Sequence, residues 1–114
     1  MTIDSYAFGK ISVDGKPYTF DVIIYPDHVT SPWWRKAGHN LETEDLAELL
    51  EAPPAVLVIG TGYYGRMQVP AETREALQAR GIEIRIGTTT EAVTELNRLA
   101  RESADVVAAL HLTC

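Results

Sequence analysis

Residues 55–65 of the chain read AVLVIGTGYYG. The continuous apolar run from Ala55 to Ile59, ending at Gly60, is typical of a β-strand that is covered on both faces. Sheets that carry such strands have helices packed on both sides, as α/β proteins do. The stretch therefore predicts a buried strand that is followed at once by a glycine-rich turn.

Helices and strands alternate after this strand. The pattern predicts a helix opened by Pro70 and closed by Gly81, and then a short strand over residues 82–86. A helix to about residue 103 follows, begun by a capping box of Thr88 and Glu91 or capped instead by Thr89 or Thr90, and residues 106–112 form the last strand. Residues 106–112 are nearly all apolar, which indicates a central position in the sheet.

The N-terminal third has the period-two alternation of strands. Asp14-Gly15 is a pair that favours a tight hairpin turn, so we expect a hairpin of residues 5–13 and 17–25, with Pro17 at a sheet edge. Residues 26–40 form a long loop, and Thr43 caps a following helix. The whole chain, residues 1–114, is thus predicted to be a single compact α/β domain, an N-terminal β-hairpin followed by alternating helices and strands in a mixed sheet.

Composition excludes several classes of partner. Of the 114 residues, 46% are hydrophobic and 23% charged, as in an average globular protein. The net charge of −6 repels nucleic acid and anionic membranes, and no basic cluster is visible along the sequence. We therefore expect binding to neither nucleic acid nor membrane. The single cysteine cannot form an internal disulfide, so we expect a cytoplasmic protein.

The turn Gly60-Thr61-Gly62-Tyr63-Tyr64-Gly65 matches the glycine spacing of a dinucleotide-binding motif. The helix does not begin at this turn, because residues 66–69 intervene before Pro70, and no acidic residue ends the next strand. We therefore predict no nicotinamide or flavin cofactor. Two interpretations remain: the turn holds a small anion with its amides, beside Arg66, or its glycines merely permit the backbone angles.

The loop of residues 26–40 is the second candidate site, because Trp33, Trp34, Arg35 and His39 lie close together in it. Neighbouring side chains of an extended segment diverge, so one indole can enter the core while the other stays outside. Tryptophan with arginine is the composition of protein interfaces. The alternative is that both rings cover the core and Arg35 pairs with an acid.

The three histidines do not form a metal site by spacing. None is paired with another histidine or with the cysteine at metal-ligand spacing, so we predict no metal. His39, which follows Gly38 in the 26–40 loop, is retained as a site candidate because imidazole titrates near neutral pH.

Three ordered segments of the chain resemble the adipogenesis-associated Mth-domain family, whose relatives include mitochondrial complex I assembly factors. The segments are Val58-Ile59-Gly60-Thr61-Gly62, then Thr89 with Ala92-Val93 and Asn97, and His111-Leu112-Thr113-Cys114, together with Trp34-Arg35 in the loop. The resemblance covers nearly the whole chain. It implies a compact α/β domain with a mixed sheet and brings no shared catalytic activity.

Asn97 has two possible roles on its predicted helix. Its amide can fasten the helix to the backbone of a neighbouring loop, for example the glycine turn, or it can line a pocket there.

Two functions follow for the chain. The first is a non-enzymatic binding or assembly module that holds a protein partner through the 26–40 loop. The second is a small-molecule site, for an anion or a substrate, between the Gly60–Gly65 loop, Thr88, and the loop bearing Arg35 and His39. The sequence favours the first, since no nucleophile with an adjacent base can be assembled from it.

Overall fold

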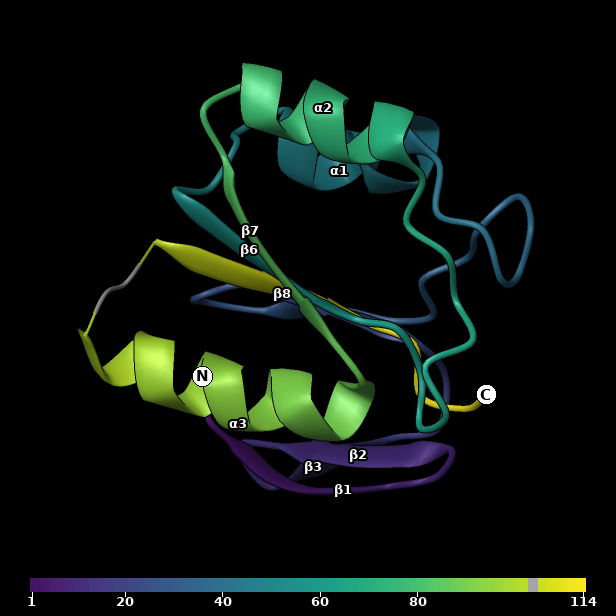
Figure 1. The fold of residues 1–114 in the computed structure, drawn as a ribbon. Helices are drawn as coiled ribbons and strands as arrows, with labels where there is room; N and C mark the ends of the chain where they lie inside the picture. Colours follow the sequence, from purple (N-terminus) through teal and green to yellow (C-terminus); the bar gives the residue numbers. More distant parts are fainter. Residues whose placement is uncertain (103–104) are drawn as a thin grey trace.

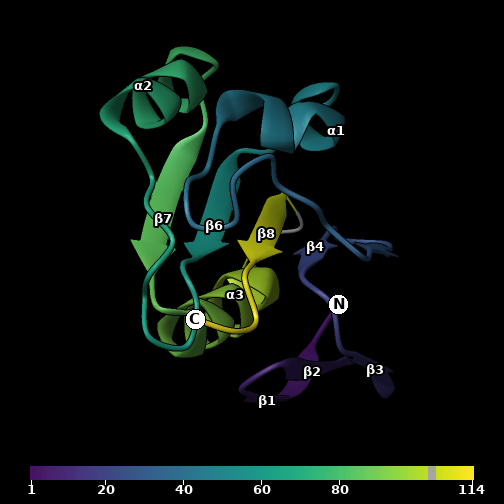
Figure 2. The ribbon, with the colours of Figure 1, turned by 90° about the vertical axis from the view of Figure 1, so that its right-hand side faces the viewer.

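The computed structural model describes residues 1–102 and 105–114. At its centre is a mixed sheet in the order β5-β4-β8-β6-β7 (Figures 1 and 2). The strands are β4 (Val22–Ile24), β5 (Val29–Thr30), β6 (Val56–Gly60), β7 (Glu83–Gly87) and β8 (Val106–Leu110). Strand β8 pairs parallel with β6 and antiparallel with β4. The mixed sheet with a central last strand is therefore confirmed.

Both faces of this sheet are covered, as the apolar run of β6 predicts. On one face lie α2 (Ala71–Ala79) and α1 (Ala47–Leu50), the latter preceded by a 3₁₀ turn (Thr43–Leu46). On the other lie α3 (Thr89–Glu102) and a small antiparallel sheet of β1 (Ile3–Ala7), β2 (Lys10–Val13) and β3 (Lys16–Tyr18) (Figure 1).

The central strand β8 divides the hydrophobic core in two. Its residues Val107 and Ala109 pack with the side chains of α1 and α2, whereas Ala108 and Leu110 pack with α3 and the small sheet. This follows from the alternation of side chains across a strand. A strand that serves two cores has no polar face, which explains why residues 106–110 are all apolar.

The expected hairpin is correct at its turn but wrong in its extent. Asp14 and Gly15 both have positive φ, 48° and 81°, as a tight hairpin turn requires. The first expected strand folds back at Gly9 and forms β1 and β2, while residues 17–25 divide between two sheets. Val22–Ile24 are buried on both faces and join the large sheet beside β8, whereas Pro17 lies in the edge strand β3 as predicted.

The helix starts are close to the expected positions. Thr88 and Glu91 form the predicted capping box, with the Thr88 amide 2.9 Å from Glu91 Oε1. At the first helix, Glu42 rather than Thr43 precedes the first turn, and its amide donates to Asp45 Oδ2 at 2.9 Å. The start therefore lies one residue earlier, because the carboxylate of Asp45 reaches back to the partly buried Glu42 amide.

Candidate functional site

The two candidate loops meet at the carboxyl ends of strands β6 and β8. The segment after β8, residues 111–114, runs between the glycine turn and the 26–40 loop, and the C-terminus faces the viewer in Figure 2. In open α/β sheets this edge is where loops from different strands converge and where ligands bind.

The two tryptophans of the 26–40 loop face opposite ways. Trp33 is 5% exposed and belongs to the core against α1, with its indole N–H donating to the carbonyl of Asp45 at 2.8 Å. Trp34 is 71% exposed, and its ring lies 6.0 Å from that of Phe20, which is also exposed. The divergence that the sequence allowed is therefore present, with Trp34 as the outer ring.

Arg35 is buried in an ion pair beneath these tryptophans. Its Nη2 lies 2.8 Å from Asp21 Oδ2, and its guanidinium stacks over the Trp33 ring at 4.7 Å. The Nε and Nη2 groups both donate to the carbonyl of Gly38. Arg35 therefore ties the loop to Asp21, at the start of β4, as well as to its own far end.

His111 completes a cluster with Asp21 and Arg35. Its Nδ1 lies 2.8 Å from Asp21 Oδ2, while the other carboxylate oxygen of Asp21 accepts the amide of Leu112 at 2.7 Å. Arg35 donates its two Nη2 hydrogens to the Gly38 carbonyl and to Asp21, which leaves none for His111. The Nδ1 of His111 is therefore the nitrogen that carries hydrogen, and it donates to Asp21. A neutral His111 then has its lone pair on Nε2.

The Asp21 carboxylate stays ionised in this setting. Burial by itself raises the pKa of Asp21, but hydrogen bonds from His111, the Leu112 amide and Arg35 outweigh it and leave the pKa below its ordinary value of 3.8. The cluster is thus an Asp⁻–Arg⁺ pair with an imidazole that the same carboxylate orients.

Two nitrogens of this cluster are buried without a hydrogen-bond partner among residues 1–102 and 105–114: Arg35 Nη1 and His111 Nε2. The ring of His39 stands edge-on to that of His111, with 5.7 Å between the ring centres. His39 itself is exposed. The candidate histidine of the loop therefore lies over the buried one.

Most amides of the glycine turn and of the two residues after it donate within the protein. Those of Tyr63 and Arg66 donate to the carbonyls of Thr113 and Cys114, at 2.6 and 3.0 Å. Four further amides also donate within the protein: that of Thr61 to the Gly87 carbonyl, Gly62 to Thr89 Oγ1, Gly65 to the Gly62 carbonyl, and Met67 to the Thr61 carbonyl. Four of these six donors bind other elements: two hold the segment after β8, one the start of α3 and one the end of β7, while the other two close the turn on itself.

Gly62 is required at its position for two reasons. Its φ is +112°, and a Cβ there would lie 2.3 Å from the carbonyl carbon of Cys114. Any side chain would therefore push the segment after β8 off the turn.

The remaining candidates hold the framework together. Thr61 Oγ1 donates to Gly87 O at 3.0 Å, Thr88 belongs to the capping box of α3, and Gly60 packs against Leu110 and Thr89. Asn97 binds the backbone of Ile3 with both its oxygen and its nitrogen, each at 2.9 Å. The fastening role of Asn97 is thus the one the geometry supports, at strand β1 rather than at the glycine turn.

A second group of exposed aromatic rings lies beside the glycine turn. Phe8 is 6.0 Å from Tyr63 and from Tyr64, and the two tyrosine rings are 5.1 Å apart. All three are exposed. Sequence patterns did not single out Phe8, because it comes from the β1–β2 turn, far from residue 63 along the chain.

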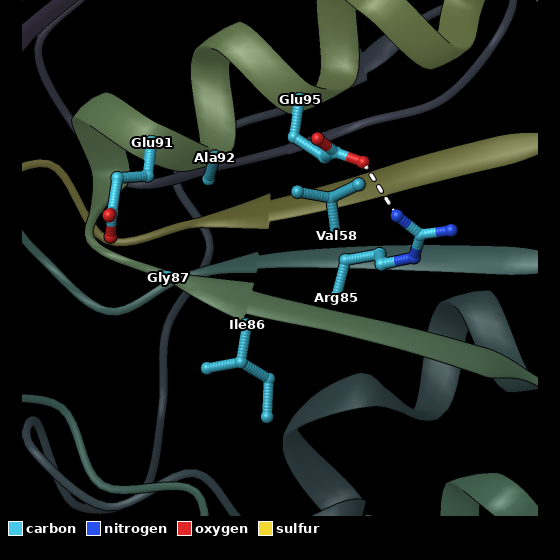
Figure 3. A pocket seen from close by; sticks show the side chains of 7 residues that line it. All are labelled: Val58, Arg85, Ile86, Gly87, Glu91, Ala92 and Glu95. Atoms are coloured by element: carbon cyan, nitrogen blue, oxygen red, sulfur yellow. Dashed lines mark hydrogen bonds and ion pairs between the residues drawn. The ribbon is translucent and has the colours of Figure 1, made fainter.

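A cavity of about 260 Å³ lies elsewhere, between β7 and α3, and is lined by seven residues (Figure 3). Arg85 reaches across it and binds Glu95 at 2.9 Å, while Ile86 points to the other side of β7. Glu91, at the opposite end, accepts from Thr88. Arg85 and Glu95 thus neutralise each other, Glu91 is held by the Thr88 cap, and the lining residues are all different from the predicted site residues.

Sequence reasoning missed Asp21 and His111. One signal was present: His111 directly follows an apolar strand at its carboxyl end, where functional side chains gather. Asp21 gave no signal, because it was placed inside a continuous strand of residues 17–25. Its role depends on the break between β3 and β4.

The chain is a single-domain α/β protein. It has a five-stranded mixed sheet with helices on both faces, a small antiparallel sheet beside α3, and a polar cluster at the strand ends. The chain belongs to the family described as protein of unknown function (DUF498/DUF598), whose model matches residues 3–111. Together with a solved Mth938-like domain of the same fold, this match confirms the resemblance to an Mth-domain family of unknown function.

Solved structures from several organisms are similar to the chain. The conserved hypothetical protein PH1505 of Pyrococcus horikoshii is 28% identical over all of both chains, with a TM-score of 0.84. A protein of Bartonella henselae, described as an outer membrane protein, is 27% identical over 98% of this chain and 94% of its own, with a TM-score of 0.82. A Mth938-like domain of Bordetella pertussis shares the fold at 24% identity and a TM-score of 0.75, over 97% of this chain and 85% of its own.

Within residues 1–102 and 105–114, no helix combines the length and apolar character needed to cross a membrane.

Proposed function

We propose that this chain is a non-enzymatic binding or assembly module that holds a protein partner through the loop of residues 26–40. The observation that carries the proposal is the exposure of Trp34, 71% of whose surface is open to solvent. Tryptophan is among the residues that contribute most to the stability of protein interfaces. A single exposed indole next to a buried one is thus a natural anchor for a partner.

The loop that carries Trp34 is held in place on both sides of this residue. Trp33 donates to Asp45 from inside the core, and Arg35 is fixed by its buried ion pair with Asp21. An aromatic side chain on an ordered backbone loses less conformational entropy on binding than one on a mobile loop. This supports a role for the loop in recognition.

The alternative function is a small-anion or substrate site at the Gly60–Gly65 loop. It is supported less well, because the amides of the turn that would bind an anion donate to the protein itself, including to Thr113 and Cys114. The Asp21–His111 pair has the arrangement of an orienting acid and a base. Its free nitrogen, Nε2, is buried, which favours a structural role over contact with a substrate.

The proposal is tested by affinity capture with the immobilised chain from extracts of cells that produce it. We expect a defined protein that binds the wild type and is lost with Trp34→Ala. Ile86→Ala is the matched control, because Ile86 is also exposed but lies on β7, outside the loop. A partner retained equally by Trp34→Ala would contradict the proposal. We expect this binding to take place in the cytoplasm.

A further inference from the structure

We infer that the segment recognised by this protein is acidic, with apolar side chains between its carboxylates. The inference rests on the proposed function and specifies the chemistry of the partner. It comes from the distribution of charge and exposed aromatic rings over one face of the fold. We call this the carboxyl-end face and define it by residues 6–10, 18–21, 34–40, 60–68 and 111–114.

Direct contacts join these five segments into one face. The carbonyl of Leu112 accepts from the Gly9 amide and the Tyr6 hydroxyl, and its amide donates to Asp21. The next two carbonyls along the chain, of Thr113 and Cys114, accept from the glycine turn. The 34–40 segment joins through Arg35 to Asp21 and through the His39 carbonyl to Gln68.

The charge on this face is opposite to that of the whole chain. Its side chains include four basic residues, Lys10, Arg35, Lys36 and Arg66, against one acid, Asp21. The rest of the chain therefore holds six Lys and Arg against fifteen Asp and Glu. A protein with a net charge of −6 thus presents a face whose side chains carry a net positive charge.

Three of the four cations on the face are available to a partner. Arg35 is neutralised by Asp21 in the interior, whereas the side chains of Lys10, Lys36 and Arg66 are exposed and form no ion pair in the described part of the chain. Two acids stand at the border of the face: Asp45 beside Lys36, where its carboxylate accepts the amides of Lys36 and Glu42, and Glu91, which accepts from the Thr88 amide.

The exposed aromatic side chains gather on this same face. Of the six large hydrophobic residues that are exposed among those the structure describes, five belong to it: Phe8, Phe20, Trp34, Tyr63 and Tyr64. The sixth, Ile86, lies on β7. Aromatic rings and cations combined in one region suit a partner segment in which apolar side chains alternate with carboxylates.

A protein segment fits this face better than a nucleic acid does. The three cations are few, and a nucleic acid would carry its regularly spaced phosphates past the face into the strongly acidic remainder of the molecule. A short acidic peptide can place its carboxylates beside Lys10, Lys36 and Arg66 while its apolar side chains contact the rings. Interactions between exposed charges are screened beyond about 10 Å at moderate salt, so local charge decides the choice.

Selection from a random dodecapeptide display library on the full chain tests the inference. We expect enriched peptides to be acidic and to contain aromatic or large aliphatic residues. Synthetic copies of the enriched peptides, labelled with a fluorophore, are then measured by anisotropy. Binding should weaken about tenfold or more, a loss of about 1.4 kcal/mol, in the double variant Lys36→Glu with Arg66→Glu.

The matched control is the double variant Arg74→Glu with Arg101→Glu. It changes the net charge of the chain by the same amount, at exposed residues of α2 and α3 away from the face. We expect it to bind within about twofold of the wild type, because charges beyond a Debye length are screened. Equal losses in the two double variants would show that only total charge matters and would overturn the inference.

The outcomes separate this inference from the proposed function. Neutral or basic peptides whose binding needs Trp34 would overturn the acidic partner and leave the binding module intact. If no enriched peptide needs Trp34 for binding, both the acidic partner and the binding module are overturned. If single-stranded oligothymidylate binds more tightly than the acidic peptides, the face is assigned to nucleic acid instead. If sedimentation velocity shows self-association that Trp34→Ala abolishes, it is assigned to a second copy of this chain.

Discussion

The side-chain amide of Asn97 binds both backbone groups of Ile3, with its oxygen accepting the Ile3 amide and its nitrogen donating to the Ile3 carbonyl, each at 2.9 Å. The pair joins α3 to β1 across 94 positions of sequence. It is therefore one of the contacts that attach the small antiparallel sheet to the rest of the fold.

Asn97→Ala should lower the free energy of unfolding by about 1–3 kcal/mol, because two partly buried backbone groups of Ile3 lose their partner. Asn97→Asp should also destabilise, since a carboxylate cannot donate to the Ile3 carbonyl. Urea denaturation measures both. Gln78→Ala, at an exposed position of α2, serves as the control. A change for Asn97→Ala no larger than the control would show that the amide pairing contributes nothing.

Gly62→Ala should destabilise the protein by about 2 kcal/mol or more, from a strained backbone and a clash with Cys114 together. Gly38→Ala is the matched control, because a Cβ there meets open space and its φ is not in the left-handed region. Its stability should stay within about 0.5 kcal/mol of the wild type. Thermal denaturation compares the two variants, and equal melting temperatures would contradict the close approach of residues 62 and 114.

The two tryptophans should respond differently to substitution. Trp33→Ala should cost about 3–5 kcal/mol, because it leaves a cavity under the loop. Trp34→Ala should stay within about 0.5 kcal/mol, because its ring is in solvent. Acrylamide quenching of each single-tryptophan variant, made with phenylalanine at the other position, reports accessibility directly. Equal protection of the two indoles would mean that the loop is only a lid on the core.

Asp21 should make the stability of the protein depend on pH in the acid range. The pKa of Asp21 in the folded protein lies below 3.8, so its stabilising contribution is complete above that ordinary value and is lost as the pH falls through the folded pKa. Asp21→Asn should therefore be less stable than the wild type at pH 7. The difference in free energy of unfolding between the two should narrow as the pH falls below 3.8.

Urea denaturation at several pH values measures this gap. Asp27→Asn is the control, because Asp27 also has a lowered pKa, from its hydrogen bond with His28, but is fully exposed. We expect little change in stability for that variant, since exposed ion pairs contribute little. A gap for Asp21→Asn that is constant across the pH range would show that the carboxylate charge is not what matters.

The sequence predicted the central part of the fold well. The apolar runs of residues 55–60 and 106–112, and the capping box of Thr88 and Glu91, depend on local patterns that tertiary contacts left unchanged. The N-terminal strands were harder, because residues 17–25 alternate without interruption in sequence. Only the packing of Val22–Ile24 beside β8 decides that the strand divides before them.

The candidate site was predicted in part for the same reason. The sequence by itself determined that the 26–40 loop carries an unusual set of aromatic and basic residues, and that the two indoles can diverge. Only the tertiary structure decided that Trp34 is the outer one, that Arg35 pairs with Asp21 rather than with another acid, and that Lys10, Lys36 and Arg66 share a face. Local patterns specify which elements form, whereas burial and charge pairing depend on contacts between residues that are distant in sequence, such as Asp21 and His111.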